Sequence, residues 1–249
     1  MKAMVLAAGL GTRLRPLTDD RPKALVTVAG RTLLELTLSR LRAFGVREAI
    51  VNIHHFADRI VDYLEANRNF GMRIEISRED VLLDTGGGLR KAAWFFLQPG
   101  AAEEPFVVHN VDVLSTIDLA RMVEFHREHN ALATLAVQQR ETSRHLLFDE
   151  HGRLCGRRAG GDVAPEVVRP AQQQQALAFS GIHVLSPRIF TGMQEEGAFP
   201  IVPVYLRLAA RGEPILAFRA DEFYWRDLGR PENLLEAERD LAGGAFPAI

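Results

Sequence analysis

The sequence predicts an α/β protein with a mostly parallel mixed sheet flanked by helices, and three observations support this. Short apolar runs that suit buried strands alternate with helical patterns through the first half of the chain. The 249 residues are 47% hydrophobic and 25% charged, which is enough apolar material for one sizeable core. Neither an internal repeat nor a flexible linker divides the chain, so we expect a single domain over residues 1–249.

The expected elements follow from local patterns. Strands are predicted at 3–7, 49–53, 73–77 and 106–108, and helices at 32–44 and 89–97, with Asp118 capping a further helix. In the second half we expect strands at 131–137, 178–184 and 215–218, and helices at 201–210 and 231–241. The segment 140–176 is rich in glycine and is expected to form hairpins and loops over a site.

Composition limits the classes of function. The formal net charge of -2 gives no overall basic field, so a nucleic-acid partner is not expected. No apolar stretch approaches membrane-spanning length, and the apolar run at the start is too short for a signal peptide. The single cysteine, Cys155, excludes an internal disulfide framework, so we expect a cytoplasmic protein with no membrane partner. The oligomeric state stays open.

The first chemical motif follows the predicted strand at 3–7. It consists of Gly9-Leu10-Gly11-Thr12-Arg13, then Pro16-Leu17-Thr18, then Pro22-Lys23. Glycines let backbone N–H groups approach an anion closely, and Arg13 and Lys23 add positive charge. A P-loop needs Gly-Lys followed by Ser or Thr, which is absent, and the dinucleotide fingerprint needs a third glycine where Leu14 stands.

Asp112 is a candidate metal ligand. Asp112 comes just past a predicted buried strand, at the carboxyl edge of the sheet, where ligands bind in open α/β folds. A hard oxygen ligand at that place suits Mg²⁺ bound to phosphate oxygens. Asp227 lies before the last predicted helix, in the segment Tyr224-Trp225-Arg226-Asp227-Leu228-Gly229.

Two further segments combine glycine with polar neighbours. Three glycines in Asp84-Thr85-Gly86-Gly87-Gly88 form a flexible turn or let a flat base lie against bare backbone. Gly181 stands in Phe179-Ser180-Gly181-Ile182-His183. The pair Arg157-Arg158 is typical of solvated charge, and a role facing an anion stays open.

Taken together, these segments resemble the signature of the sugar-1-phosphate nucleotidylyltransferases. The resemblance covers Met1 to about Leu241, and the Thr-Gly-Gly-Gly form is most similar to the N-acetylmuramic acid 1-phosphate uridylyltransferases. Mannose-1-phosphate and heptose-1-phosphate guanylyltransferases carry similar segments. The sequence departs from the family at Ala24, where a second proline is usual, at Val111, where a glycine is usual, and at His183, where an aromatic residue is usual. The usual sugar-binding Glu is not located, although Glu166 is close to its place.

The resemblance implies a single Rossmann-like domain of the nucleotide-diphospho-sugar transferase type, with a nucleotide-binding part at about 1–117 and a sugar-binding part at about 118–241. It also implies roles for individual residues. The implied catalytic residues are Arg13, Lys23 and Asp112, and the implied Mg²⁺ ligands are Asp112 and Asp227. The nucleotide would contact Ala8, Gly9, Gly11, Thr12, Arg13, Lys23, Thr85, Gly86 and Gly87, and the sugar would contact Asn110, Gly181 and Trp225.

The implied reaction joins a nucleoside triphosphate, with UTP favoured, to a sugar 1-phosphate and releases pyrophosphate. Three alternatives stay open. The enzyme could be a guanylyltransferase acting on mannose- or heptose-1-phosphate, it could use a phosphocholine-type acceptor, or the chain could be an inactive regulator that binds nucleotide-sugars.

Overall fold

A computed structural model describes residues 1–98, 103–161 and 163–244. Its central sheet has ten strands, and the first half of the chain contributes the parallel part. The strand β1 (Lys2–Leu6) lies between β4 (Glu48–Ile53) and β6 (Phe106–Asn110), and β5 (Arg73–Arg78) extends this side beyond β4. All three pairings are parallel. Because parallel strands end at the same edge, the loops after β1 and β6 are neighbours.

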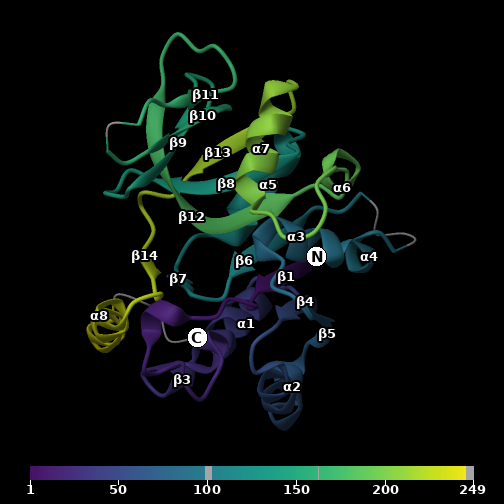
Figure 1. The fold of residues 1–249 in the computed structure, drawn as a ribbon, viewed down its shortest axis with the longest axis vertical. Helices are drawn as coiled ribbons and strands as arrows, with labels where there is room; N and C mark the ends of the chain where they lie inside the picture. Colours follow the sequence, from purple (N-terminus) through teal and green to yellow (C-terminus); the bar gives the residue numbers. More distant parts are fainter. Residues whose placement is uncertain (99–102, 162, 245–249) are drawn as a thin grey trace.

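Helices cover both faces of this parallel part, as Figure 1 shows. Successive side chains of β1 point to opposite faces of the sheet. Ala3 and Val5 belong to one apolar cluster, and Met4 belongs to the other. The first cluster includes residues of α1 (Leu33–Ala43), α2 (Ala57–Ala66), α5 (Leu119–Glu128) and α8 (Pro231–Ala242). The second includes residues of α3 (Asp84–Lys91), α4 (Ala93–Phe96), α6 (Ile189–Gly192) and α7 (Ile201–Ala210).

The second half of the chain extends the same sheet, mainly with antiparallel pairings. The long strand β12 (Gln175–Leu185) pairs with β6, β8 (Ala133–Gln138) and β9 (Arg144–Phe148). Beyond β9 lie β10 (Leu154–Ala159) and β11 (Glu166–Val167), while β13 (Ile215–Arg219) runs parallel to β8. The hairpins expected in 140–176 are therefore present as β9, β10 and β11.

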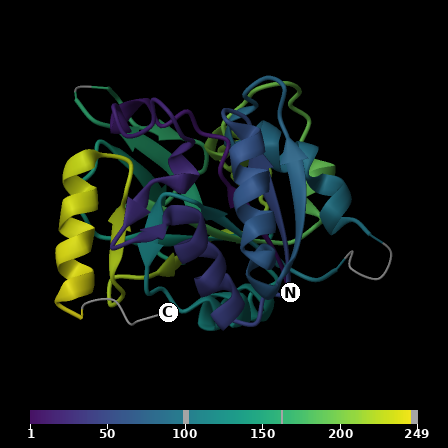
Figure 2. The ribbon, with the colours of Figure 1, turned by 90° about the horizontal axis from the view of Figure 1, so that it is seen from below.

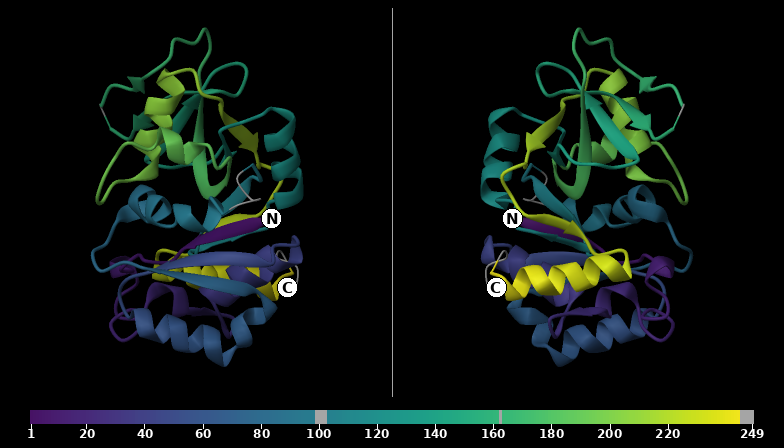
Figure 3. Two further views of the ribbon diagram at one scale, coloured as in Figure 1. Left: turned by 90° about the vertical axis from the view of Figure 1, so that its right-hand side faces the viewer. Right: turned by 90° about the vertical axis from the view of Figure 1, so that its left-hand side faces the viewer.

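Small elements complete the fold. Two short ladders join β2 (Thr27–Val28) to β3 (Arg31–Thr32) and β7 (Val113–Ser115) to β14 (Trp225–Asp227). The 3-10 turns are Thr12–Leu14, Lys23–Leu25 and Arg68–Gly71. Figure 2, seen from below, shows the C-terminal helix α8 on the same side of the molecule as α1 and α2, and Figure 3 shows these helices below the upper part that holds β9 to β12. The strand β14 leads the chain back between these parts.

Most expected elements are confirmed, and the differences have local causes. Thr32 caps α1 by accepting from the Glu35 amide at 3.0 Å, and Asp118 caps α5 by accepting from the Ala120 amide at 2.9 Å. The expected helix at 89–97 is wrong at its start, because α3 begins at Asp84 and contains the three glycines. Helix α2 was not predicted, and no helix of the described ranges is long and apolar enough to cross a bilayer.

Candidate active site

The ends of β1 and β6 open into a cavity of about 500 Å³, which we call the loop cavity. The two strands are in register at Leu6 and Asn110, and the Val111 amide donates to the Leu6 carbonyl at 3.1 Å, so the loops that follow start side by side. The cavity is lined by Leu6, Ala7, Ala8, Gly9, Lys23, Asn52, Leu82, Asp84, Thr85, Asn110, Val111, Asp112 and Ala198.

The glycine loop is held open toward this cavity. Gly11 adopts a φ of +66°, and a Cβ there would lie 2.9 Å from Thr18 Cγ2, so only glycine fits. The Thr18 hydroxyl donates to the Gly11 carbonyl at 2.9 Å and closes the loop. Within the described ranges, the amides of Ala8, Gly9 and Leu10 have no hydrogen-bond acceptor. These free N–H groups suit an anion in the cavity.

Lys23 and Asp112 form an ion pair at the floor of the loop cavity. Lys23 is only 9% exposed, and it follows Pro22 at the start of a 3-10 turn. The Asp112 carbonyl accepts from the Leu228 amide at 2.7 Å, which ties this loop to the segment after β14. The pair therefore holds the Lys23 ammonium and the Asp112 carboxylate together at the carboxyl edge of the sheet.

Asp227 and Arg13 meet at a second place on the same edge. Asp227 pairs with Val113 in the β14–β7 ladder, one residue after Asp112. Its Oδ1 accepts from the Gly229 amide at 2.7 Å. A Cβ at Gly229 would lie 2.7 Å from both Arg13 Nη2 and Asp227 Oδ1, so glycine is required for these side chains to approach.

The three consecutive glycines pack inside the protein. Gly86 and Gly87 donate their amides to the Phe199 carbonyl, at 2.9 and 3.1 Å. A Cβ at Gly86 would lie 2.5 Å from the Phe199 ring. These amides are therefore occupied, and neither glycine lines the loop cavity, although Thr85 does.

A buried polar chain supports the loop cavity from behind. Asn52 accepts from the Ala7 amide at 2.7 Å and donates to Glu79 Oε1 at 2.7 Å. Glu79 is 2% exposed, and its other oxygen accepts from the Leu83 amide at 2.9 Å, just before α3. A Cβ at Gly88 would lie 2.7 Å from both Asn52 Nδ2 and Glu79 Oε1. These hydrogen bonds link the end of β1 to the start of α3.

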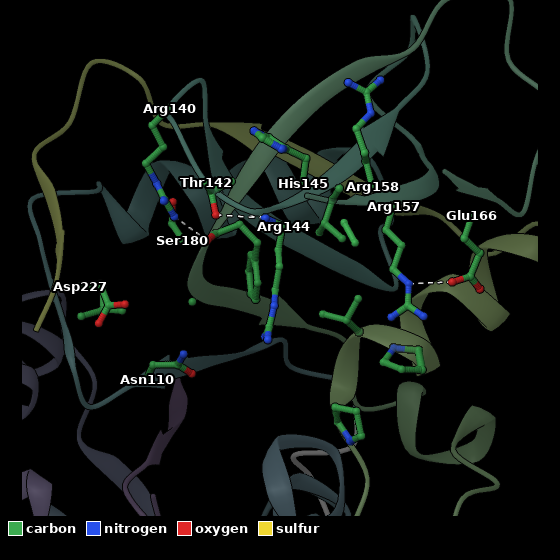
Figure 4. A pocket seen from close by; sticks show the side chains of 18 of the residues that line it. Asn110, Arg140, Thr142, Arg144, His145, Arg157, Arg158, Glu166, Ser180 and Asp227 are labelled. Atoms are coloured by element: carbon green, nitrogen blue, oxygen red, sulfur yellow. Dashed lines mark hydrogen bonds and ion pairs between the residues drawn. The ribbon is translucent and has the colours of Figure 1, made fainter. Parts of the chain in front are cut away.

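A larger cavity of about 690 Å³ adjoins the first, and we call it the arginine cavity. Asn110 and Asp112 line both cavities. Apart from Val113, its other lining residues come from the second half of the chain. Figure 4 shows its polar side chains. The lining residues include Arg140, Thr142, Arg144, His145, Arg157, Arg158, Glu166, Ser180, Gly181, Trp225 and Asp227.

Gly181 brings β12 against Asn110. Its φ is +73°, and a Cβ there would lie 2.8 Å from Asn110 Nδ2 and 3.1 Å from Val113 Cγ2. Nearby, the Trp225 indole donates to the Ser180 carbonyl at 2.8 Å, and the Arg140 guanidinium lies 3.6 Å from the Trp225 ring centroid. Burial lowers the pKa of Arg140.

Three buried polar atoms of this cavity lack a hydrogen-bond partner among the described residues: Asn110 Oδ1, Ser180 Oγ and Arg140 Nε. Unsatisfied buried polar atoms are rare in native proteins, because each one costs desolvation free energy. Since all three line one cavity, a polar ligand with several hydroxyl groups would satisfy them.

The structure brings many of the predicted site residues together. Ala8, Gly9, Lys23, Thr85 and Asp112 line the loop cavity, and Asn110, Gly181, Trp225 and Asp227 line the arginine cavity. Gly11, Thr12, Arg13, Gly86 and Gly87 do not line the loop cavity. Sequence reasoning missed Asn52, Glu79, Arg140 and Arg144, which no motif marks.

The chain matches the family described as "Nucleotidyl transferase" over residues 2–243, so it belongs to that family and is an enzyme. It is 36% identical to N-acetylmuramate alpha-1-phosphate uridylyltransferase of Caulobacter vibrioides, over 96% of each chain. It is 28% identical to mannose-1-phosphate guanylyltransferase catalytic subunit beta of Dictyostelium discoideum, over 94% of this chain and 63% of that one. A putative glucose-1-phosphate thymidylyltransferase from Bacillus anthracis shares the fold, with a TM-score of 0.78 over 96% of this chain and 94% of that one, at 18% identity. These matches confirm the family resemblance and the fold class.

The family generally uses a divalent metal ion, and Asp112 and Asp227 are the candidate ligands for it. Among the described residues there is no cluster of three or more His, Cys, Asp or Glu side chains suited to a metal. Asp112 and Asp227 nevertheless fit a cation that takes one or two carboxylates and fills its other positions with substrate oxygens and water. One oxygen of each contacts Lys23 or the Gly229 amide, which leaves the second oxygen available.

Proposed function

We propose that this enzyme transfers a nucleotidyl group from a nucleoside triphosphate, with UTP favoured, to a sugar 1-phosphate, and releases pyrophosphate. The observation that carries the proposal is the pair of adjoining cavities that share Asn110 and Asp112. One has a glycine loop with free amides and a lysine, which suits phosphates. The other has unsatisfied buried polar atoms, which suit sugar hydroxyls.

The proposed division of labour follows the two halves of the chain. The nucleotide would bind residues 1–117, with Ala8 and Gly9 beside the phosphates and Thr85 beside the base, while Gly11 and Thr12 shape the loop and Gly86 and Gly87 pack behind it. The sugar would bind residues 118–241 together with Asn110. In support, all lining residues of the loop cavity except Ala198 come from the first part. All those of the arginine cavity except Asn110, Asp112 and Val113 come from the second.

The chemistry needs positioning and charge more than a general base. The attacking oxygen of the sugar 1-phosphate is already an anion, and it displaces pyrophosphate from the α-phosphorus in line. Two anions must therefore approach each other. Lys23 and Arg13 supply positive charge at the loop side of the shared edge, where charge develops as pyrophosphate leaves.

Mg²⁺ is the proposed cofactor, and Asp112 and Asp227 would hold it. When bound, it would neutralise phosphate charge and orient phosphate oxygens. The ion pair between Lys23 and Asp112 gives Lys23 a second role, because it keeps the Asp112 carboxylate at the floor of the loop cavity.

UTP is the proposed donor because the uridylyltransferase relative matches over nearly its whole length, at 36% identity, whereas the guanylyltransferase relative is 28% identical and longer. The base would not be read by the Gly86 and Gly87 amides, since Phe199 already accepts from both. Besides Lys23 and Asp112, the polar side chains of the loop cavity are Asn52, Asp84, Thr85 and Asn110, and we propose that the base is read among these. A cationic acceptor such as phosphocholine is disfavoured by the arginines of the second cavity.

The test is a pyrophosphate-release screen of UTP, GTP, CTP and ATP against a panel of sugar 1-phosphates, with and without Mg²⁺. We expect Mg²⁺-dependent turnover with the highest kcat/KM for UTP. A site that hydrogen-bonds one base rejects others strongly, because mismatched polar groups stay unpaired. A clear preference for GTP would contradict the uridylyl assignment and support a guanylyltransferase. No turnover with any pair would contradict the proposed function.

A further inference from the structure

At the end away from Asn110 and Asp227, the arginine cavity carries more positive charge than a neutral sugar requires. Strands β9 and β10 supply Arg144, Arg157 and Arg158, and the carboxylates Asp112 and Asp227 belong to other elements. Figure 4 shows Arg144 reaching into the cavity and Arg157 pointing into it from the side away from Asn110 and Asp227. Arg158 points away from the cavity.

The register of the β9–β10 ladder explains this arrangement. Arg157 pairs with Leu146, and Ala159 pairs with Arg144, so Arg144 and Arg157 project from the same face. Arg158 pairs with His145 and projects from the opposite face. A register shift between Leu154 and Gly156 produces this result, since an unbroken ladder would exchange the faces of the two neighbouring arginines.

The two inward arginines differ in their partners. Arg157 donates from Nε to Glu166 Oε2 at 2.6 Å, which orients its guanidinium and leaves its two terminal nitrogens for another acceptor. The Arg144 guanidinium has no acidic partner among the described residues. Both arginines are exposed at this cavity, which Pro200, Val202 and Pro203 also line. A guanidinium that projects into a cavity without an acidic partner favours a bound anion.

The position of this charge separates it from the reacting phosphates. Under the proposed function, the phosphate of the acceptor lies near Asp112, where both cavities meet. The unsatisfied atoms of Asn110, Ser180 and Arg140 then face the sugar ring. Arg144 and Arg157 lie beyond these groups, in the direction of the sugar's far side.

We propose that the acceptor is a sugar 1-phosphate with a second anionic group on its ring, and that Arg144, supported by Arg157, binds this group. This inference rests on the proposed function. The anion is a carboxylate or a second phosphate, since a guanidinium binds both in a planar, bidentate manner. The neighbouring Arg158 has the same charge and also lines the cavity, but its guanidinium points away from the cavity.

The experiment compares matched acceptors and matched variants. N-acetylglucosamine 1-phosphate and N-acetylmuramate 1-phosphate differ only in a carboxylate-bearing ether, and glucose 1-phosphate is compared with glucuronate 1-phosphate and with glucose 1,6-bisphosphate. The readout is the ratio of kcat/KM for the anionic acceptor to that for its neutral partner. We expect this ratio to exceed one in the wild type for at least one anionic acceptor. Preference for the carboxylates or for the bisphosphate identifies the anion.

In Arg144→Ala the ratio should fall about 10- to 100-fold, the effect of one lost hydrogen bond to a charged group. Arg144→Lys should restore part of it, and Arg158→Ala should keep the wild-type ratio. Equal or better turnover of the neutral acceptors by the wild type would overturn the inference, and so would an equal fall in Arg144→Ala and Arg158→Ala. If no acceptor is turned over, the proposed function fails. Calorimetric binding of the same sugar 1-phosphates then decides the inference, which tighter binding of the neutral members would overturn.

Discussion

Gly181→Ala tests how the sugar side of the site is built. Gly181 has a φ of +73°, a left-handed conformation that costs an ordinary residue about 1–2 kcal/mol. The new methyl group would also lie 2.8 Å from Asn110 Nδ2, well inside van der Waals contact. Asn110 must therefore turn away, and its unsatisfied Oδ1 would no longer face the cavity.

The two effects have separate magnitudes. The backbone strain should lower the free energy of unfolding by about 1–2 kcal/mol, which corresponds to a fall in Tm of roughly 2–8 °C for a chain of this size. Loss of one hydrogen bond to the sugar, about 0.5–1.5 kcal/mol, should reduce kcat/KM for the sugar 1-phosphate about 2- to 12-fold.

Gly30→Ala is the matched control. Gly30 has a φ of +78°, and a Cβ there would meet no atom within 4 Å, so this variant carries the backbone strain without displacing a neighbour. Thermal melting and steady-state kinetics of both variants separate strain from displacement. Equal kcat/KM for the sugar 1-phosphate in the two variants would refute the role given to Gly181 and Asn110.

The remaining predictions concern the metal, the helix packing and acid stability. Asp112→Asn and Asp227→Asn should each raise the Mg²⁺ concentration for half-maximal activity, because a neutral amide binds a hard cation less well; an unchanged midpoint in both variants would reject a shared metal site. Gly87→Ala should destabilise the fold by about 1–3 kcal/mol in urea unfolding, because the methyl group meets a backbone carbonyl, and an unchanged midpoint would contradict this. Burial lowers the pKa of His109 to about 4 and of His126 to about 4. The unfolded chain therefore binds more protons than the folded protein between about pH 6.5 and 4, so stability is highest above pH 6.5 and falls as the pH falls toward 4. Urea unfolding at pH 7.5 and pH 5 measures this, and equal free energies would contradict it.

Much of the fold was predictable because its elements have strong local signals. Thr32 and Asp118 are cap residues followed by apolar residues at helical spacing, and both caps are confirmed. Helix α2 carries its own signal in Ile60 and Leu64, which are spaced by one helical turn and buried. That spacing could have identified the helix.

The three glycines of α3 show where local propensity is overridden. Glycine disfavours a helix interior, so the sequence predicts a helix that starts after Gly88. In the fold, Gly86 and Gly87 pack against residues 197–199, more than one hundred positions later in the chain, where a Cβ would collide. Tertiary packing therefore decides this helix start, and no local pattern reveals such a contact.

In the site, too, local motifs predict some residues, and tertiary structure decides the others. Gly9, Lys23 and Asp112 lie in motifs or just after a strand, and the structure brings them to one cavity. Arg157, and not Arg158, shares the face of Arg144 only because the β9–β10 ladder shifts its register between Leu154 and Gly156. A sequence does not reveal a single shift of this kind, although one residue of slip reverses every side chain.

The most direct test of the central claim compares the wild type with Lys23→Ala, using UTP, Mg²⁺ and an accepted sugar 1-phosphate. Mass spectrometry identifies the nucleotide-sugar, and a coupled assay counts pyrophosphate. The wild type should form one pyrophosphate for each UDP-sugar, and Lys23→Ala should turn over about 10²-fold more slowly at saturating substrate, with circular dichroism showing an intact fold. Near-normal turnover by a folded Lys23→Ala variant, or pyrophosphate release without a nucleotide-sugar, would contradict the account.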